Sequence, residues 1–481
     1  MTSPDLDALG RESSWEGVRA LVTGFGVSGF AAADSLQHLG AQLTVLDDGD
    51  TDQLREKGSL LEFLGVDVRL GAGATDSFPE DIDVVVTSPG WPPSAPLLVE
   101  AARRGIPVWG DVELAWRLRG DNPAPWLTVT GTNGKTTTVQ MLDAILRAEG
   151  LNSIAVGNVG VPVLEAVMNP DGFDVLAVEL SSFQLHWSSS LSARASAVLN
   201  VAPDHLDWHG SAEAYAKAKG SIYDNTQIAC VYNVQDPQTE DLVREADVIE
   251  GCRAIGFTLG IPGPSMIGLV DDVIADRAFI EDRSTNAAEL GSINDLKSQA
   301  PHNIANALAA AALARAHGVS ARAVRDGLKG FTPDAHRIAE VATIKDVHYV
   351  DDSKATNTHA AQASIRSFES VVWIAGGLAK GASFDELVQA TRNRLRGVVL
   401  IGRDRDVIAD ALQRHAPDVR VVEVDNGETD LMDRVVDAAT SLAQPGDTVL
   451  LAPGCASMDQ FTNYAVRGDA FTEAVRRLAP E

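Results

Sequence analysis

The residue types that bind nucleotide phosphates occur together in one segment, Thr128 to Thr138, which reads TVTGTNGKTTT. A β-forming run ends here in a turn bounded by Gly131 and Gly134, and Lys135 and Thr136 then begin an amphipathic helical pattern. In such a strand–turn–helix unit, backbone N–H groups cradle phosphate oxygens, the lysine meets the terminal phosphates and the hydroxyl reaches Mg²⁺. The segment therefore predicts an ATP site. The alternative is an ordinary glycine-bearing turn with a surface lysine.

The spacing within this segment departs from the common phosphate loop. The pattern G-x-x-x-x-G-K-[ST] would place its first glycine at position 129, but that residue is Val129. The first glycine is instead Gly131, which gives a tighter G-T-N-G-K-T turn. Because the strand before it and the helix after it are intact, the prediction of a phosphate site stands.

A second glycine-rich turn lies near the N-terminus, after the β-forming run 18–23. Gly24, Gly26 and Gly29 form G-x-G-x-x-G, and Asp47 ends the next predicted strand. This is the dinucleotide fingerprint, in which the acid takes a ribose hydroxyl, so an NAD-dependent dehydrogenase is a rival interpretation. The same turn fits any nucleotide diphosphate or simple close packing, and a dehydrogenase would leave the later loop without a role.

Further polar residues lie where two later predicted strands end. Glu179 ends a predicted strand, which is where a carboxylate that holds Mg²⁺ beside a phosphate loop usually lies. The next strand is followed by Asp204, His205, Asp207 and His209, whose spacing is not a zinc signature. Mg²⁺ prefers oxygen ligands, so the residues alone leave the role of His205 open.

Lys219 lies in the predicted helix 211–223, one turn beyond Tyr215. By composition it is an ordinary helix lysine. Nothing in the local sequence distinguishes it from Lys217.

Three compact polar segments follow β-forming runs in the C-terminal third: residues 351–357, 376–384 and 452–471. Ligands bind at the carboxyl edge of such sheets. Together the segments predict a pocket for a small anionic molecule, with candidate residues Lys354, Thr356, Lys380 and Ser457.

Composition limits the class of protein. The 481 residues carry a net charge of −28, which argues against nucleic-acid and anionic-membrane surfaces. Three cysteines, too few and too scattered for a disulfide framework or a zinc site, indicate reduced thiols. The polar, acidic N-terminus predicts no signal peptide, and the longest apolar run, 304–314, is too short to span a membrane. We expect a soluble, cytoplasmic protein.

β-forming runs alternate with helical stretches almost throughout, which predicts an α/β protein with parallel sheets. We expect three domains, 1–120, 121–331 and 332–481, with the first boundary in the polar, proline-bearing stretch RGDNPAP and the second near 331–334. The outer two should be Rossmann-like. The central one should be ATPase-like, with a small side sheet formed by short runs between 251 and 295.

Taken in order, the segments GTNGKTT, ELSSFQL, NVAPDHLD, HNIANALAA, DDSKATN and CASMDQFTN resemble the Mur ligase family of peptidoglycan synthesis nearly end to end. The C-terminal segments are most similar to those of members that add D-glutamate. Members that add meso-diaminopimelate would show D-N-P-R in the C-terminal domain, whereas the only D-N-P here, 121–123, lies in the first linker. Folylpolyglutamate synthase shares the ATP core but should lack the N-terminal nucleotide-sugar domain.

The resemblance implies an ADP-forming amide ligase that joins D-glutamate to UDP-N-acetylmuramoyl-L-alanine through an acyl phosphate and a tetrahedral intermediate. It implies ATP, two Mg²⁺ ions and a carbamylated Lys219. Its partners would be these small molecules, with no nucleic acid or membrane, and the protein would be a monomer. The implied catalytic residues are Lys135, His205 and Lys219, and the implied metal ligands are Thr136, Glu179, His205 and carbamylated Lys219.

The resemblance also implies three sets of binding residues. Those for ATP are Gly131, Thr132, Asn133, Gly134, Lys135, Thr136, Thr137, Asn303, Asn306, Arg337 and Asp352. Those for the UDP substrate are Val27, Ser28, Asp47, Asp48, Ser88, Asn158, Ser181 and Gln184. Those for D-glutamate are Lys354, Thr356, Lys380, Ser457 and Tyr464. The chain departs from the familiar family pattern at Asp48 (threonine), Gly49 (arginine) and Tyr464 (phenylalanine).

Overall fold

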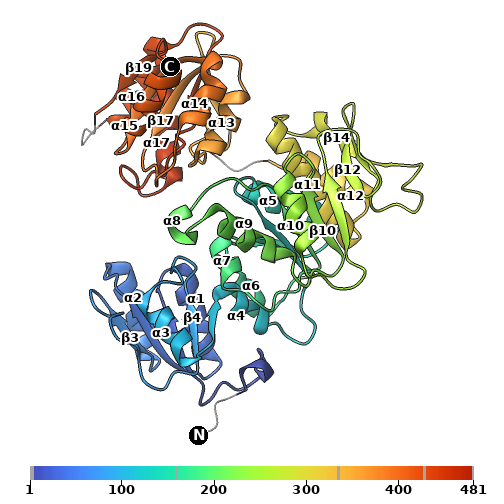
Figure 1. Cartoon of the computed structure of the whole chain (residues 1–481), viewed down its shortest axis with the longest axis vertical. Helices are drawn as coiled ribbons and strands as arrows, with labels where there is room; N and C mark the ends of the chain where they lie inside the picture. The colour runs from blue at the N-terminus through green and yellow to red at the C-terminus, as the bar shows by residue number, and fades with distance from the viewer. Residues whose placement is uncertain (1–4, 159, 333–335, 426–429, 479–481) are drawn as a thin grey trace. The chain divides into compact units, whose positions relative to one another are not determined.

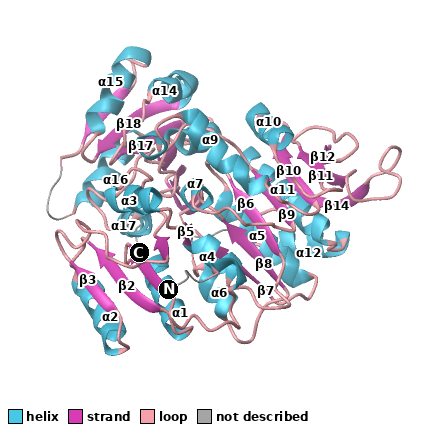
Figure 2. Cartoon of the chain, turned by 60° about the horizontal axis from the view of Figure 1, so that its bottom comes forward, coloured by secondary structure: helices cyan, strands magenta, loops and turns pink. Residues whose placement is uncertain are grey.

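The structure, a computed structural model, describes residues 5–158, 160–332, 336–425 and 430–478. By compactness the chain divides into two units, one formed by 1–299 with 303–331 and the other by 300–302 with 332–481 (Figure 1). Helices and strands alternate in both units, as expected for α/β architecture (Figure 2). The predicted second boundary near 331–334 falls partly on residues outside the described ranges.

The first sheet of the first unit is parallel and has the order β3-β2-β1-β4-β5. Its strands are β1 (Arg19–Thr23), β2 (Gln42–Asp47), β3 (Asp67–Leu70), β4 (Val84–Thr87) and β5 (Val108–Gly110). Its helices are α1 (Val27–His38), α2 (Asp52–Phe63), α3 (Pro96–Arg104) and α4 (Asp111–Arg117). β1 begins one residue later than the predicted run. The glycine-rich turn and Asp47 both lie at the carboxyl edge of the sheet.

The second sheet of this unit has the order β14-β13-β12-β11-β10-β9-β6-β8-β7. Its strands are β6 (Trp126–Thr130), β7 (Ser153–Gly157), β8 (Val175–Glu179), β9 (Ala195–Val198), β10 (Ala229–Asn233), β11 (Arg253–Phe257), β12 (Met266–Val270), β13 (Val273–Asp276) and β14 (Ala288–Ser292). The short runs expected between 251 and 295 are present. They extend the central sheet, with β12–β14 antiparallel, instead of forming a separate side sheet.

Helices of two kinds accompany this sheet: long ones that cover its faces and short ones that follow strand ends. They are α5 (Lys135–Ala148), α6 (Val163–Met168), α7 (Ser182–His186), α8 (Leu206–His209), α9 (Ala212–Gly220), α10 (Pro237–Glu245), α11 (Pro301–His317) and α12 (Ala321–Gly330). The alanine-rich part of α11, residues 306–314, is buried throughout. None of the helices in the described ranges is long and apolar enough to cross a membrane.

The sheet of the second unit has the order β15-β16-β20-β17-β18-β19, antiparallel only between β15 and β16. Its strands are β15 (Ala339–Ile344), β16 (Val347–Asp351), β17 (Val371–Gly376), β18 (Leu395–Ile401), β19 (Arg420–Glu423) and β20 (Thr448–Leu451). Its helices are α13 (Thr358–Arg366), α14 (Asp385–Thr391), α15 (Arg405–His415), α16 (Leu431–Leu442) and α17 (Tyr464–Leu478).

The cysteines are free, but two of them are less scattered than the sequence indicates. Cys230 on β10 and Cys252, which precedes β11, bring their sulfur atoms to 3.8 Å. β10 and β11 are parallel neighbours, so pairing of the strands places these residues on one face of the sheet.

Helix α5, which begins at the phosphate loop, is held in place by close packing against α12. A Cβ atom on Gly327 of α12 would lie 2.5 Å from the Cα atom of Ile145 and 2.9 Å from the backbone oxygen of Ala144. Real Cβ atoms do not approach backbone so closely, so only glycine allows the two helices this separation.

We predict that Gly327→Ala lowers the free energy of unfolding by about 1–3 kcal/mol, because the added methyl group forces α12 away from α5. Gly330→Ala is the matched control: its Cβ atom would meet nothing within 4 Å, so this variant should be neutral or slightly more stable. Urea unfolding of both variants tests this. Equal effects of the two substitutions would contradict the packing argument.

Candidate functional site

The turn between β6 and α5 has the backbone geometry of a phosphate loop. Gly131 and Gly134 have φ angles of +154° and +86°, which side chains disfavour. A Cβ atom on Gly134 would lie 2.3 Å from Oδ1 of Asn306 on α11, so Asn306 lies against the loop and glycine suits this position. Helix α5 then begins at Lys135, and the start of a helix favours an anion because its first N–H groups have no acceptor within the helix.

The loop is braced by the segment that follows β9. Thr132 N donates to the backbone oxygen of Asn200 at 3.0 Å, and Asn133 N donates to its side-chain Oδ1 at 2.8 Å. The hydroxyls of Thr132 and Tyr215 lie 3.1 Å apart. Sequence reasoning missed Asn200 and used Tyr215 only as a spacing marker, because their contacts with the loop are long-range. These bonds hold the loop in shape.

Two lysine side chains converge on one backbone oxygen of the loop. Lys135 Nζ and Lys219 Nζ donate to the Gly131 carbonyl at 2.9 Å and 3.0 Å. Lys219 is only 2% exposed, whereas Lys217 points to solvent, so the fold separates two residues that the local sequence could not. Burial, and secondly the charge of Lys135, hold the pKa of Lys219 well below its usual value, which favours a neutral amine.

Glu179 presents an unsatisfied carboxylate oxygen next to this loop. The residue ends β8 and is 2% exposed. Its Oε1 accepts a hydrogen bond from Asn158 Nδ2 at 3.0 Å, while its buried Oε2 has no hydrogen-bond partner among the described residues. A buried oxygen of this kind is costly unless a cation or water completes it. The negative charge of Glu179 also acts on Lys219, which places the two groups in one electrostatic environment.

The described polar groups near the loop suit a Mg²⁺ ion that is held partly by nucleotide phosphates, and do not form a metal site made of protein ligands alone. Within the described ranges no three His, Cys, Asp or Glu side chains form a metal-binding group. In nucleotide sites Mg²⁺ is usually held by one or two carboxylates together with phosphate oxygens and water. Glu179 Oε2 and the hydroxyl of Thr136, which is buried in the first turn of α5, supply that type of donor.

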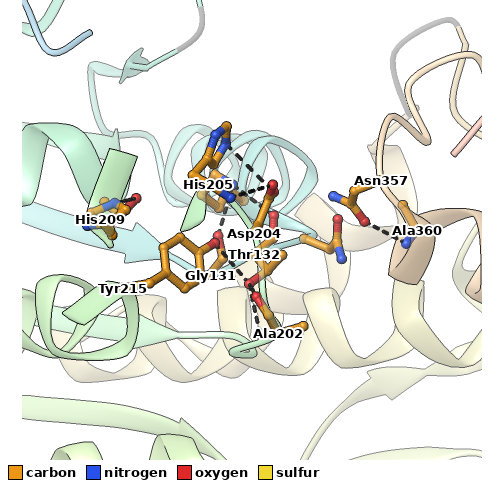
Figure 3. Close-up of polar contacts among 12 residues, drawn as sticks. Gly131, Thr132, Ala202, Asp204, His205, His209, Tyr215, Asn357 and Ala360 are labelled. Carbon is orange, nitrogen blue, oxygen red and sulfur yellow. Dashed lines mark hydrogen bonds and ion pairs between the residues drawn. The ribbon is translucent and has the colours of Figure 1, made fainter. Parts of the chain in front are cut away.

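His205 lies beside Asp204 and the braced loop, as Figure 3 shows. It has a left-handed backbone, with φ at +51°, and precedes α8. Its Nε2 lies 3.7 Å from Asp204 Oδ2, and its ring packs on Phe183 with centroids 4.7 Å apart. These contacts fix the position of the imidazole ring, which is half-buried and still reaches solvent.

Another member of the predicted acidic and histidine cluster, His209, makes packing contacts. His209 Nε2 lies 2.9 Å from the hydroxyl of Ser182, and its ring packs against Tyr215 at 5.3 Å. These contacts explain His209 as a packing residue. The side chain of Asp207 lies outside the described part of the structure.

In the first sheet, the G-x-G-x-x-G turn is shaped by close backbone approach. A Cβ atom on Gly29 would lie 1.8 Å from the Gly24 carbonyl oxygen, which also accepts a hydrogen bond from Ser88 Oγ at 2.9 Å. Helix α1 begins at Val27 and Ser28, which are exposed and half-buried. Their N–H groups form the anion-facing end of the turn.

The two acidic residues after β2 are occupied in bonds to the surrounding loops. Asp47 accepts from the backbone N–H groups of Phe25 at 2.5 Å and Gly49 at 2.7 Å. Asp48 accepts from the Thr75 hydroxyl at 2.6 Å, and this bond holds its pKa below the usual value. Both carboxylates thus organise the turn. Their roles toward a ribose or uracil stay predictions.

Ser181 and Gln184 form the capping box of α7, and Gln184 also contacts α4, which follows the first sheet. Gln184 Nε2 donates to Oδ2 of Asp111 at 3.2 Å. Asp111 is buried, and burial raises the pKa of its carboxyl. On α11, Asn303 is 6% exposed and donates to the backbone oxygen of Ser298 at 2.7 Å.

In the second unit, the three predicted polar segments meet at one edge, as expected. They follow β16, β20 and β17, which are neighbours in the sheet. Leu378 and Ala456 exchange backbone hydrogen bonds at 2.8 Å and 3.0 Å. Arg467, 1% exposed on α17, donates to the backbone oxygens of Ser353 at 2.8 Å and Cys455 at 3.2 Å. Sequence reasoning missed Arg467, which joins two of the segments.

The residues expected to bind an amino acid differ in exposure within this edge. Lys354 Nζ lies 5.3 Å from the ring centroid of Tyr464, and Ser457 is buried. Lys380 is exposed and has a left-handed backbone with φ at +51°, while Thr356 is half-buried. The edge thus presents two lysines and the hydroxyl groups of Thr356 and Ser457, which suits a small dicarboxylate.

Asp352 is a buried carboxylate in the same unit. Ser364 Oγ donates to its Oδ2, and Ile338 N donates to its Oδ1 at 3.3 Å. Burial raises its pKa to about 6, against the opposing hydrogen bond of Ser364 and the charge of Arg337. Arg337 and Asp352 therefore interact, and their contact with a nucleotide stays a prediction.

Comparison with known proteins identifies the class. Models of the MurD-like N-terminal domain, the Mur ligase middle domain and the glutamate ligase domain match residues 18–110, 129–314 and 336–455. The chain belongs to the Mur ligase family. It is 64% identical to the UDP-N-acetylmuramoylalanine–D-glutamate ligase of Streptomyces coelicolor, over 97% of this chain and 99% of that protein. A relative of the same name from Thermobifida fusca is 54% identical, over 96% and 99%.

Solved structures share the fold at low sequence identity. A pseudomurein peptide ligase from Methanothermus fervidus has a TM-score of 0.60 at 16% identity and covers 96% of this chain and 100% of its own. MurF ligase from Thermotoga maritima, solved in complex with ADP, has a TM-score of 0.56 at 17% identity and covers 99% and 100%. The three-domain Mur ligase architecture predicted from the sequence is confirmed.

The raised pKa of Asp352 predicts a specific pH dependence. The native state keeps the proton up to about pH 6, while the unfolded chain loses it near the ordinary value of 3.8, so this group lowers stability as pH rises between these values. Asp352→Asn should remove that loss, so its free energy of unfolding should rise relative to that of the parent by up to roughly 3 kcal/mol between pH 4 and 7. Urea unfolding, followed by hydrogen exchange of peptides from residues 336–425, measures the difference. Parallel pH profiles for the two proteins would exclude it.

Proposed function

We propose that this chain is an ATP-dependent, ADP-forming amide ligase that adds D-glutamate to UDP-N-acetylmuramoyl-L-alanine in peptidoglycan precursor synthesis. The observation that carries the proposal is the phosphate loop flanked by the buried Lys219 amine and the unsatisfied oxygen of Glu179. The names of the Streptomyces coelicolor and Thermobifida fusca relatives support the substrates. We further propose that the protein acts in the cytoplasm, as a monomer, with domains 1–120, 121–331 and 332–481.

The reaction requires activation of a carboxylate. Its negative charge repels an attacking amine, and its leaving group would be oxide. A carboxylate oxygen of the alanyl group attacks the γ-phosphorus of ATP, the bond to the bridging oxygen breaks, and ADP leaves. The D-glutamate amine then attacks the acyl carbon, loses a proton, and inorganic phosphate leaves from the tetrahedral intermediate. Charge neutralisation and alignment of two anions are therefore the chief demands on the protein.

The residues of the loop meet the first demand. The ammonium group of Lys135 and the N–H groups at the start of α5 would face the phosphate oxygens. Thr136 and Glu179 would hold one Mg²⁺, and His205 would bind at a second site. When bound, Mg²⁺ neutralises the phosphate charge that otherwise opposes attack by an anion. Lys135 now donates to the carbonyl oxygens of Gly131 and Thr132, so its ammonium group is held within the loop before phosphate arrives.

Lys219 would act as its carbamate. A neutral amine attacks CO₂, and the new N–C bond forms with loss of one proton, which gives an anion. The lowered pKa of Lys219 favours the neutral amine, and the carbamate anion, unlike an ammonium group, would be attracted by the charge of Lys135. The anion would face the metal-binding side of the loop, where Glu179 also lies.

Substrate selectivity would come from the remaining predicted residues. The exposed N-terminus of α1, with Val27 and Ser28, suits the uridine diphosphate. Lys354 and Lys380 suit the two carboxylates of D-glutamate. An NAD-dependent dehydrogenase would leave the braced loop and Glu179 without a role. A non-catalytic nucleotide-binding scaffold would have no need for the buried Lys219.

Amino-acid selectivity tests the proposed reaction directly. With ATP, Mg²⁺ and UDP-N-acetylmuramoyl-L-alanine, phosphate release should depend on D-glutamate and should be far slower with L-glutamate, meso-diaminopimelate or buffer. Release is measured with a coupled phosphate assay, and the product is identified by mass. If D-glutamate gave no more phosphate than L-glutamate, the proposed reaction would be wrong.

Lys219→Ala should abolish activity, with an expected loss of at least about 100-fold, because a metal-facing anion is lost. Added short carboxylates such as acetate or formate should restore part of the rate by replacing the carbamate. Lys217→Ala is the matched control on the exposed side of the same helix and should retain activity. Full activity of Lys219→Ala would remove carbamylation from the mechanism, whereas loss without rescue would point to a structural role.

A further inference from the structure

A small, partly open cavity of about 110 Å³ lies in the first unit, where the linker between its two sheets passes α6. Its polar lining comes from the N-terminal segment, the linker, the start of β6 and the end of α6. The side chains concerned are those of Arg11, Arg119, Asn122, Trp126 and Asn169. No Asp or Glu belongs to the described lining, although the chain as a whole carries a net charge of −28.

Arg119 is a half-buried cation without a carboxylate partner in the described ranges. Its Nε donates to the backbone oxygen of Trp116 at 2.7 Å, and its guanidinium carbon lies 3.0 Å from the Trp116 ring centroid. These contacts fix the plane of the guanidinium group. Burial alone lowers the pKa of Arg119 to about 10, and no carboxylate in the described ranges offsets it. The charge therefore favours an anion from outside the chain.

Trp126 adds an unsatisfied donor. The residue is 1% exposed, and its indole Nε1 is buried without an acceptor among the described residues. The ring is held by an edge contact with Trp116, with centroids 5.0 Å apart. Such orphaned N–H groups are rare in folded proteins. Indole Nε1 does donate to a carbonyl oxygen at 2.7–3.3 Å in Trp15, Trp187, Trp208 and Trp373.

Arg11 brings a second guanidinium group from the N-terminal segment. It donates to the backbone oxygen of Val167 at 3.0 Å, and its contact with Glu12 is longer, at 3.7 Å, with that carboxylate 74% exposed. Two arginines, a tryptophan and two asparagines thus line a cavity whose described lining has no acid. Of the two arginines, Arg119 has no carboxylate partner in the described ranges.

We propose that this cavity binds a small oxyanion of the size and charge of inorganic phosphate. Its volume would hold a few water molecules or one tetrahedral oxyanion, and it is too small for a nucleotide. The bound anion would join Arg11, the linker at Arg119 and the first residue of β6, and would so stabilise the junction of the two sheets. It is separate from the phosphate loop, which lies at the other end of β6, roughly 15 Å away by strand geometry.

The indole N–H of Trp126 provides a direct test. The full-length protein, labelled with ¹⁵N-tryptophan, gives one indole signal per tryptophan, and Trp126→Phe assigns the signal at issue while removing only the donor and the indole shape. Sodium phosphate, sulfate and chloride are titrated at constant ionic strength with saturating Mg-ADP, so that the phosphate loop is occupied. We expect phosphate, and more weakly sulfate, to shift the Trp126 signal, while those of Trp187 and Trp208 stay in place.

Arginine variants decide whether the shift reports the cavity. Arg119→Gln and Arg11→Gln should each weaken phosphate binding at least tenfold, whereas Arg103→Gln, an exposed arginine of α3, should leave it unchanged. An equal shift with chloride, a shift that survives both cavity variants, or no shift with phosphate would overturn the proposal. The readout is binding and not ligase activity, so it stands or fails independently of the proposed reaction.

Discussion

The backbone oxygen of Gly131 accepts hydrogen bonds from two lysines, and the rest of the site depends on this shared acceptor. Burial, and secondly the charge of Lys135, lower the pKa of Lys219, because two ammonium groups at one buried oxygen repel each other. The shared acceptor thus favours the neutral form of the buried amine. The carboxylates of Asp204 and Glu179 act in the opposite direction and raise that pKa.

The shared acceptor requires a loop that keeps its shape without a ligand. Asn200 and Tyr215 brace it from one side, and Asn306 lies against Gly134 from another. Close packing limits movement of the helix behind it, because α12 approaches α5 at backbone distance through Gly327. Rigid loops of this kind place donors before the ligand binds, which lowers the reorganisation required when charge develops.

Local patterns in the sequence carried much of the site. The strand, turn and helix of the phosphate loop, Glu179 at a strand end and the three polar segments of the second unit were all predictable, because each depends on residues close in the chain. Contacts between distant segments were not. The difference between Lys219 and Lys217 depends on which face of α9 is buried. Arg467 donates a hydrogen bond to a residue about 110 positions away. The sheet to which β12–β14 belong is known only from their pairing with β11.

Strand β6 shows why an acidic chain can still concentrate donors for anions. All five of its residues are buried, and the hydroxyls of Thr128, Ser196 and Thr226 form a chain at 2.9 Å per bond that fixes it to its neighbours. Its C-terminal end opens into the phosphate loop, and its N-terminal residue is Trp126, with an unsatisfied indole N–H. Long-range contacts hold the groups at both ends: Asn200 braces the phosphate loop, and an edge contact with Trp116 holds the Trp126 ring. A strand that is bonded along its length therefore fixes the positions of donor groups at both of its ends.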